Sequence, residues 1–233
     1  MKKFISHITK IISLALLLSQ VSSAYASIII GGTRVIYPAG EKEVTVKVTN
    51  KGQNPVLIQS WMDNGDTNTK PENIKVPFIL TPPINRVDPQ KGQTLRMSFT
   101  GAPLPADKES VFWLNVLEIP AKNASVADKN ILQVAFRSRI KVFWRPAGLA
   151  SDASEAAKSL VWRAEGGKVT AVNNSPYFVS LVSASVNGHK VDAPMIAPKS
   201  SQSIALNVTA GQKIQYIFVN DYGAYINHDA VAK

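Results

Sequence analysis

The chain has 233 residues, no cysteine and a formal net charge of +10 at neutral pH. This length allows one large domain or two ordinary ones. The lack of cysteine excludes disulfides, zinc–thiolate sites and cysteine nucleophiles, so an exported fold must be held together by its apolar cores. The positive charges are scattered, which is typical of a solvated basic surface and requires no nucleic-acid partner.

The first 26 residues have the layout of a secretory signal peptide. Three lysines precede an apolar run over residues 11–18, and small residues up to Ala26 then provide a cleavage site before Ser27. The apolar run is too short to span a bilayer, and a membrane anchor is the alternative. Removal of the leader leaves 23 Lys and Arg against 16 acidic residues, a formal charge of +7. We expect a mature protein outside the cytoplasm with no membrane span.

Period-two alternation of apolar and polar residues dominates the first half of the mature chain. Residues 43–50, EVTVKVTN, place three valines on one face, as in a half-buried antiparallel strand. Further strands, bounded by Gly, Pro and Asn, are predicted in NPVLIQSWM, TLRMSFTG and SVFWLNVLEIP. Strands at this spacing predict an all-β sandwich over residues 27–147.

A change in composition marks a second domain. After Pro146 the chain becomes small and polar, and SEAAKSL is expected to form one short helical turn. Beyond it, two strands are predicted around the Asn-Ser-Pro turn of KVTAVNNSPYFVSLVSASVNG, and two more in SQSIALNVTA and GQKIQYIFVNDYGAY. Residues 148–233 are therefore predicted to form a smaller all-β domain.

Sequence patterns for catalysis and for metal or cofactor binding are missing. His189 follows an Asn-Gly turn signal, His228 lies near the C-terminus, and neither has a metal-ligand spacing. No nucleophile-elbow or phosphate-loop pattern occurs. We expect no catalytic residues, no metal and no cofactor. An enzyme ranks last because these patterns are missing. It remains an alternative because a catalytic triad assembles in space and leaves no local sequence pattern.

Four segments in chain order resemble the periplasmic pilus (fimbrial) assembly chaperones of the PapD-like family: FILTPPINRVDPQKGQTLRM, FWLNVLEIP, RSRIKVFWRPAGL and IFVNDYGA. The resemblance implies two immunoglobulin-like β-sandwich domains at an angle with a cleft between them. It also implies a chaperone that works in the periplasm without ATP, binds and folds a pilus subunit, and delivers it to an outer-membrane usher. The short polar segment KNASVADKN makes the chain similar to the short-loop type.

The stretch ILQVAFRSRIKVFWRP, residues 131–146, is expected to carry the subunit-binding strand. Leu132, Val134 and Phe136 have the spacing to fill an apolar groove in an incomplete subunit, while the backbone pairs with the subunit's strand edges. Burial of three such side chains would contribute about 5–9 kcal/mol before ordering costs. The alternative is that they face the protein's own core, as in most alternating strands. The resemblance favours donation.

The resemblance implies two cations, Arg34 and Lys141, that bind the subunit's C-terminal carboxylate. Such an anchor would fix the register, because a strand alone can slide by two residues and keep its face. Without the resemblance, each would be read as an ordinary surface cation. Lys141 is odd-numbered and the apolar triplet is even-numbered, so a regular strand places them on opposite faces. Either a bulge lies between Phe136 and Lys141, or the lysine reaches the cleft from the other side.

The resemblance further implies a buried charged cluster that ties the two domains together. The positions that match it here are Glu118, Arg145 and Asp221, and the planar guanidinium group of one arginine can bind two carboxylates. Its expected role is structural, setting the angle between the domains. An exposed donor strand is also a hazard for edge-to-edge pairing, so the free protein is expected to form a self-capping homodimer.

Two other classes of protein are considered. A secreted two-domain β-sandwich that binds carbohydrate or a host surface, like an adhesin, would present an exposed aromatic platform. The four tryptophans are instead scattered and lie mostly within strand patterns, which favours core positions. A pilus subunit would need its own N-terminal donor extension, whereas SIIIGGTRVIYP leads directly into the first strand.

Overall fold

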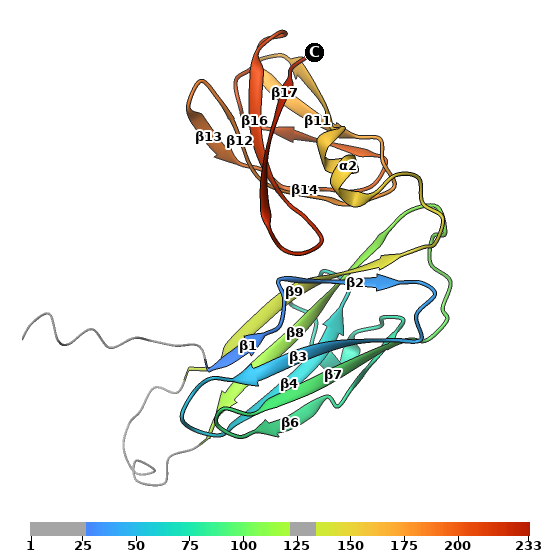
Figure 1. The fold of residues 1–233 in the computed structure, drawn as a ribbon, viewed down its shortest axis with the longest axis vertical. Coiled ribbons are helices and arrows are strands. Elements are labelled where there is room, and N and C mark those ends of the chain that lie inside the picture. Colours follow the sequence, from blue (N-terminus) through green and yellow to red (C-terminus); the bar gives the residue numbers. More distant parts are fainter. Residues whose placement is uncertain (1–26, 122–133) are drawn as a thin grey trace, which may run out of the picture.

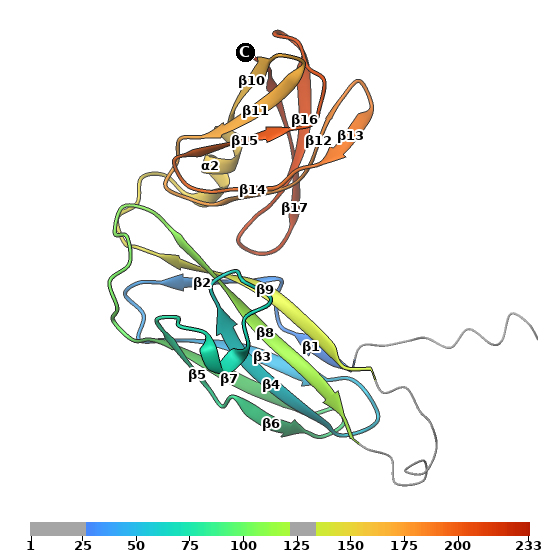
Figure 2. The ribbon, with the colours of Figure 1, turned by 180° about the vertical axis from the view of Figure 1, so that it is seen from behind.

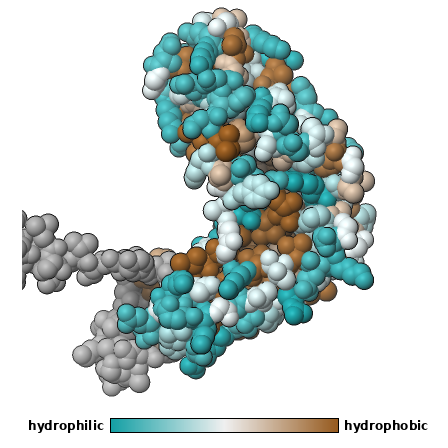
Figure 3. Space-filling model, in the orientation of Figure 1, coloured by the Kyte–Doolittle hydropathy of each residue, from teal (hydrophilic) through white to brown (hydrophobic). Residues whose placement is uncertain are grey.

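The structure is a computed structural model that describes residues 27–121 and 134–233. Two β-sandwiches are set at an angle to each other (Figures 1 and 2), and the space-filling view shows a hollow between them (Figure 3). This is the predicted fold class. The signal-peptide prediction for residues 1–26 and the position of Leu132 lie outside the described residues. In the part of the chain that is described, no helix is long and apolar enough to cross a membrane.

The first sandwich packs a four-stranded sheet against a five-stranded sheet. The four-stranded sheet has the order β1 (Ile28–Ile30), β3 (Glu43–Asn50), β7 (Gly92–Phe99) and β5 (Phe78–Thr81). The five-stranded sheet has the order β2 (Arg34–Pro38), β9 (Phe136–Arg145), β8 (Ser110–Pro120), β4 (Val56–Asp63) and β6 (Ile84–Val87). A short 3₁₀ helix, η1 (Pro71–Asn73), follows β4.

The second sandwich has a three-stranded and a five-stranded sheet. The smaller sheet has the order β10 (Val161–Glu165), β11 (Lys168–Asn173) and β15 (Ser200–Ile204). The larger has the order β13 (His189–Asp192), β12 (Val179–Val186), β16 (Lys213–Val219) and β17 (Tyr225–Val231), and β14 (Met195–Ile196) pairs with β12. The predicted helical turn is α2 (Ala153–Lys158), whose first turn is capped by the side chain of Asp152 accepting from the backbone N–H of Glu155.

Each sandwich has its own core, built from the alternating apolar residues of its strands. In β3, Val46 and Val48 point inward while Glu43, Thr45 and Lys47 are exposed. The largest fully buried side chains of the first core include Tyr37, Ile58, Leu95, Met97 and Leu114. Those of the second include Trp162, Tyr216, Phe218, Ile196 and Leu206. Two separate cores hold the two sandwiches without disulfides.

Strand β9 is regular throughout its length. Its antiparallel pairing with β8 runs from Glu118 opposite Phe136 to Ser110 opposite Trp144 without a register shift. The bulge considered between Phe136 and Lys141 is therefore not there, and Lys141 lies on the opposite face of the sheet from Phe136. The other edge of β9 pairs with β2 in parallel, but only from Lys141 to Arg145. Among the described residues, no strand covers the edge of β9 from Phe136 to Ile140.

Candidate functional site

Arg34 and Lys141 are direct neighbours on the face of the sheet that looks toward the second sandwich. They are paired residues at the point where β2 joins β9. Arg34 Nη1 donates to the carbonyl of Val219, at 3.0 Å, and lies 3.4 Å from Ser180 Oγ. Both of these acceptors belong to the second sandwich. Arg34 therefore lies in the hollow and links its two walls.

Burial affects both cations of this pair. Burial lowers the pKa of Lys141, and the nearby charges of Arg34 and Arg139 lower it further. Burial also lowers the pKa of Arg34, against the opposing influence of Asp221 and Glu109. Arg34 Nε is buried without a hydrogen-bond partner. In the described part of the chain, neither cation forms an ion pair.

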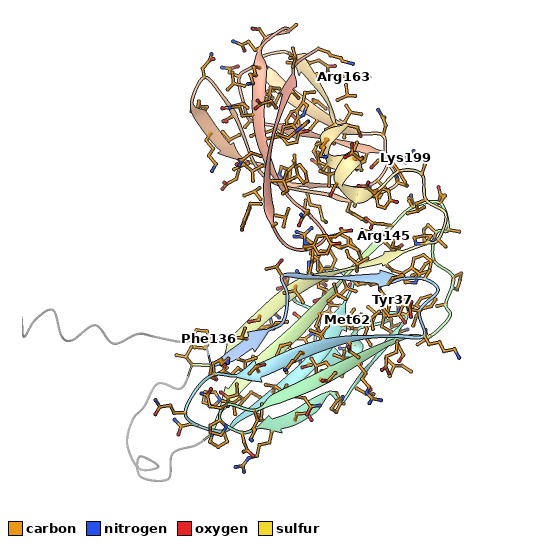
Figure 4. All side chains as sticks on the ribbon, viewed as in Figure 1. Tyr37, Met62, Phe136, Arg145, Arg163 and Lys199 are labelled. Carbon is orange, nitrogen blue, oxygen red and sulfur yellow. The ribbon has the colours of Figure 1, made fainter. Side chains whose placement is uncertain are left out.

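A second charged cluster lies at the junction of the two sandwiches, where Figure 4 shows Arg145. Arg145 Nε donates to Glu109 Oε1 at 2.7 Å. Its two terminal nitrogens donate to the carboxylate of Asp221, at 2.7 and 3.0 Å. Glu109 Oε2 accepts from the backbone N–H of Phe178, at 2.8 Å. One guanidinium group thus binds a carboxylate from each sandwich. Its central carbon also lies 5.2 Å from the centroid of the Tyr177 ring.

The pKa values in this cluster follow from burial and charge. Burial raises the pKa of Glu109, against the effects of Arg145 and of the Phe178 N–H. Burial alone would lower the pKa of Arg145, but its hydrogen bonds to Asp221 and the charge of Glu109 raise it above its ordinary value. The arginine is therefore charged at every relevant pH, and it is the ion-pair partner of both carboxylates in the described structure.

The prediction that Glu118 belongs to this cluster is wrong. Strand β8 runs antiparallel to β9, so Glu118 lies opposite Phe136, at the end of the sheet far from Arg145. Its carboxylate accepts instead from the hydroxyl of Ser27 and, at 3.1 Å, from the backbone N–H of Ile28. Glu109, immediately before β8, is the acidic residue within reach of Arg145. Glu109 could have been found from the sequence as an acidic residue at the start of β8. The antiparallel pairing of β8 with β9 places this start next to Arg145.

Arg139 has a partner that the sequence analysis missed. Its Nη2 and Nε atoms bind the two oxygens of the Asp63 carboxylate at 2.5 and 3.0 Å, and its guanidinium carbon lies 4.5 Å from the centroid of the Trp113 ring. Asp63 also accepts from Asn115 Nδ2 at 2.6 Å and from the Gly65 N–H at 2.7 Å. Burial would raise the pKa of Asp63, but these hydrogen bonds and the charge of Arg139 lower it. Of the two neighbouring cations on β9, Arg139 is neutralised and Lys141 is not.

The predicted donor residues that the structure describes are exposed. Val134 has 48% and Phe136 57% of its surface exposed, so neither packs into the core of its own domain. Ile140, on the same face of β9, does pack against that core. Figure 4 shows Phe136 at the end of the first sandwich remote from Arg145, and Figure 3 shows a band of hydrophobic side chains over β1 and β2 along the hollow. Exposed apolar side chains therefore lie beside the uncovered edge of β9.

Potential metal-binding groups and the tryptophans bear on the alternative classes of protein. The described residues contain no group of three or more His, Asp or Glu residues arranged to hold a metal ion. The tryptophans form no exposed platform. Trp144 and Trp162 are buried, and Trp61 and Trp113 are partly buried.

Comparison with known proteins gives a consistent result over both sandwiches. Residues 27–150 match the family of pili and flagellar-assembly chaperones, PapD N-terminal domain, and residues 155–230 match the pili assembly chaperone PapD, C-terminal domain. The chaperone protein FimB/FhaD of Bordetella pertussis is 46% identical over 93% of this chain and 92% of its own length. The probable fimbrial chaperone YadV of Escherichia coli is 44% identical over 90% of this chain and 91% of its own.

Solved structures agree. The YadV chaperone has a TM-score of 0.74 at 42% identity and covers 88% of this chain and 99% of its own. The SafB chaperone of Salmonella enterica, solved in complex with the SafA pilin, has a TM-score of 0.78 at 25% identity and covers 90% of this chain and 98% of its own. These relatives are chaperones and not enzymes. The chain belongs to the PapD family of pilus-assembly chaperones.

Proposed function

We propose that this protein is a periplasmic chaperone that binds an incomplete pilus subunit by lending it strand β9, and then delivers it to an outer-membrane usher. The observation that carries the proposal is the free edge of β9, flanked by exposed Val134 and Phe136 and ending at two unpaired cations. A subunit that lacks one strand exposes a groove and two strand edges, and a single extended donor satisfies both. Membership of a chaperone family supports this reading.

The pairing of β9 limits where a subunit strand can lie. Strand β2 covers the edge of β9 from Lys141 onward, so an added strand has room only up to Ile140. It would then end where β2 begins, beside Arg34 and Lys141. A C-terminal carboxylate reaches these cations only if the added strand runs parallel to β9, in the same direction as β2. The geometry thus supports both a polarity and an end point for the subunit strand.

The two faces of β9 would have different tasks. Phe136 and Val134 project on one face and would enter the apolar groove of the subunit. Lys141 lies on the other face and, with Arg34, would bind the carboxylate of the subunit's last residue. Desolvated cations without a counter-ion gain most from such a partner, because charge-assisted hydrogen bonds are about twice as strong as neutral ones. Sliding by two residues would move the carboxylate away from the cations, so the pair would set the register.

The Arg145 cluster is proposed to hold the two walls of the cleft in position. Arg145 and Glu109 belong to the first sandwich and Asp221 to the second, so the ion pairs cross the junction. Loss of the arginine would leave two carboxylates unpaired, one of them almost completely buried. We assign these residues a structural role rather than direct contact with the subunit.

Family membership and the leader pattern support location in the periplasm after cleavage near Ala26, and family membership supports transfer to an usher. The short segment KNASVADKN supports the short-loop type. In the absence of a subunit, the free edge and the exposed Phe136 would pair with a second copy of the chain, giving a self-capping homodimer.

The test is capture of a partner from the periplasm of the native host. Tagged wild-type protein is compared with Lys141→Ala and with Lys190→Ala, a control that removes an exposed lysine of the second sandwich. A small β-rich protein, identified by mass spectrometry, should be retained by the wild type and the control and lost from Lys141→Ala. Equal retention by all three would contradict the carboxylate anchor, and no partner with any of them would contradict the chaperone function.

A further inference from the structure

Glu118 is a buried carboxylate that the proposed function does not use. Only 8% of its surface is exposed, at the end of β8 remote from the cleft. Its two oxygens are bound by the first two residues that the structure describes, through the hydroxyl of Ser27 and the backbone N–H of Ile28. The Ser27 carbonyl in turn accepts from the backbone N–H of Lys51 at 2.6 Å, and Ile28 pairs with Asn50. Residues 27 and 28 are therefore held firmly against this carboxylate.

No cation of the described residues lies within ion-pair distance of Glu118. The elements around it carry few charges. Strand β1 has none, β4 has only Asp63 at its far end, and Arg86 of β6 is paired with Asp88. Arg137 of β9 belongs to the opposite face of the sheet, and Lys51 and Lys91 are exposed. Among the described residues Glu118 is therefore a buried carboxylate without a positive partner, and burial of such a charge is costly.

We propose that Glu118 is the binding site for the α-ammonium group of a mature chain that begins at Ser27. Hydrolysis of the Ala26–Ser27 bond consumes one water molecule and leaves a carboxylate on Ala26 and, at neutral pH, an ammonium group on Ser27. In the uncut chain the same nitrogen is a neutral amide. Within a serine, the nitrogen and the hydroxyl oxygen are about 3–4 Å apart. Because that hydroxyl binds Glu118, the new positive charge forms beside the carboxylate.

Removal of the leader would then complete the fold as well as release the chain. The ion pair exists only after cleavage at this one bond, so a chain cut elsewhere, or not cut, keeps an uncompensated Glu118. Opposite charges within about 4–6 Å favour the charged forms, so the pKa of the α-ammonium should exceed the ordinary 7.7–8.0. The raised pKa would stabilise the fold at pH values below about 8, and that stability would be lost as the pH rises through the folded-state pKa.

The first experiment measures the α-amino pKa of protein purified from the periplasm, after N-terminal sequencing. Amino groups are ¹³C-methylated and followed by NMR as a function of pH. The expected result is a sequence that starts at Ser27 and a midpoint raised by about one unit, which returns to the ordinary range in Glu118→Gln. Glu165→Gln, an exposed carboxylate in the other sandwich, should leave the midpoint raised. A different first residue, or the same midpoint with and without Glu118, would overturn the proposal.

A second experiment separates the charge from crowding. Chains that begin at Ser27 or keep Tyr25 and Ala26 are compared in the wild-type and Glu118→Gln backgrounds by denaturant unfolding. The extension should raise the unfolding equilibrium constant about tenfold in the wild type, matching one pKa unit, and leave Glu118→Gln nearly unchanged. An equal loss in both backgrounds would show a steric effect and overturn the proposal. Neither readout involves a subunit, so failure here is distinct from failure of the chaperone function.

Discussion

Arg34 and Lys141 face each other at the point where the free edge of β9 becomes a covered one. On one side of this pair β2 completes the sheet. On the other side, five residues of β9, from Phe136 to Ile140, pair with β8 along one edge and have no strand along the opposite edge in the described structure. Arg34 and Lys141, which form no ion pair in the described part of the chain, thus lie where β2 would stop an added strand. The two positive charges therefore lie at the boundary between the uncovered and the covered part of the β9 edge.

The carboxylate anchor predicts a preference for a free C-terminus. A peptide copying the C-terminal strand of the captured subunit should bind the wild type more tightly as the free acid than as the amide. The difference should be about 10–100-fold, from a charged hydrogen bond worth about 1.5–3 kcal/mol. Lys141→Ala or Arg34→Ala should bind both forms equally. Isothermal calorimetry measures this, and a wild type that does not distinguish acid from amide would contradict the anchor.

The same anchor predicts a pH dependence. The pKa of Lys141 in the free protein lies below its ordinary value of 10.5, chiefly because of burial. A bound carboxylate favours the charged lysine, so binding should be strongest below the lowered pKa and weaken as the pH rises through it. The free-acid peptide should show this loss and the amidated peptide should not. Identical pH profiles for the two peptides would assign the effect to another group.

Phe136 should matter for binding and not for folding. Phe136→Ser removes an exposed ring, so denaturant unfolding should change by no more than about 0.5 kcal/mol. Subunit capture and self-association at high concentration should both be lost, as measured by pull-down and analytical ultracentrifugation. Val142→Ala is the matched control, because Val142 is fully buried in the same strand. It should destabilise the fold by about 1–3 kcal/mol while a folded fraction still binds. A Phe136→Ser protein that captures the subunit normally would contradict strand donation.

Arg145 should contribute to the orientation of the sandwiches. Arg145→Ala leaves Glu109 and Asp221 without their common partner, at an expected cost of about 3–5 kcal/mol. Small-angle scattering should show a wider range of angles between the domains than in the wild type. Asp229→Asn, which removes an exposed ion pair with Lys213, should change neither property. An unchanged scattering curve for Arg145→Ala would mean that the junction is held by other contacts.

Local alternation in the sequence was enough for the fold class and for individual strands. Residues 43–50 were predicted as a strand, and β3 has these bounds. The second domain was predicted with four strands but also contains β10, β13, β14 and a separate β17. Short or mixed segments such as HKVD and MI lack the alternation that marks a longer strand. They form because their neighbours offer a partner edge.

Contacts between distant residues were beyond reach. Arg139 and Asp63 are 76 positions apart, and no local pattern connects them. The error at Glu118 has the same origin, because the choice between the two ends of β8 depends on the antiparallel register with β9. The even and odd positions of Phe136 and Lys141 left two arrangements open in the sequence. The regular pairing of β9 with β8 shows that the two side chains lie on opposite faces of the sheet.

The pair of Arg139 and Asp63 predicts an acid-sensitive fold. The pKa of Asp63 is lowered from its ordinary value of 3.8, where burial is outweighed by hydrogen bonds from Arg139 and Asn115. A lowered pKa of an acid contributes stability above the unfolded value, and this stability is lost as the pH falls from about 3.8 through the folded value. Asp63→Asn should lower stability at pH 7 by about 3 kcal/mol and flatten this acid limb. Unfolding curves between pH 2 and pH 7 test it, and an unchanged acid limb would contradict it.

The hairpin between β16 and β17 reaches the first sandwich at Gly223, and this contact should be sensitive to a single methyl group. A Cβ on Gly223 would clash with Thr33 Oγ1, next to Arg34, and the residue has a φ of +82°. Gly188 offers a close control, because its φ is +81° and a Cβ there would meet nothing within 4 Å. Both Gly→Ala changes carry the backbone cost of about 1 kcal/mol, so the difference between them reports the contact alone.

Gly223→Ala should therefore be the more destabilising of the two, by about 1–3 kcal/mol. It should also weaken binding of the free-acid peptide, because the displaced hairpin carries the Val219 carbonyl that positions Arg34. Thr33→Ala removes the clashing hydroxyl and should restore part of both losses in the double variant, whereas it should not help Gly188→Ala. Equal effects of the two glycine changes, or no rescue by Thr33→Ala, would show that the hairpin does not pack tightly against Thr33. Arg34 would then be positioned by its own strand, β2, and not by the hairpin.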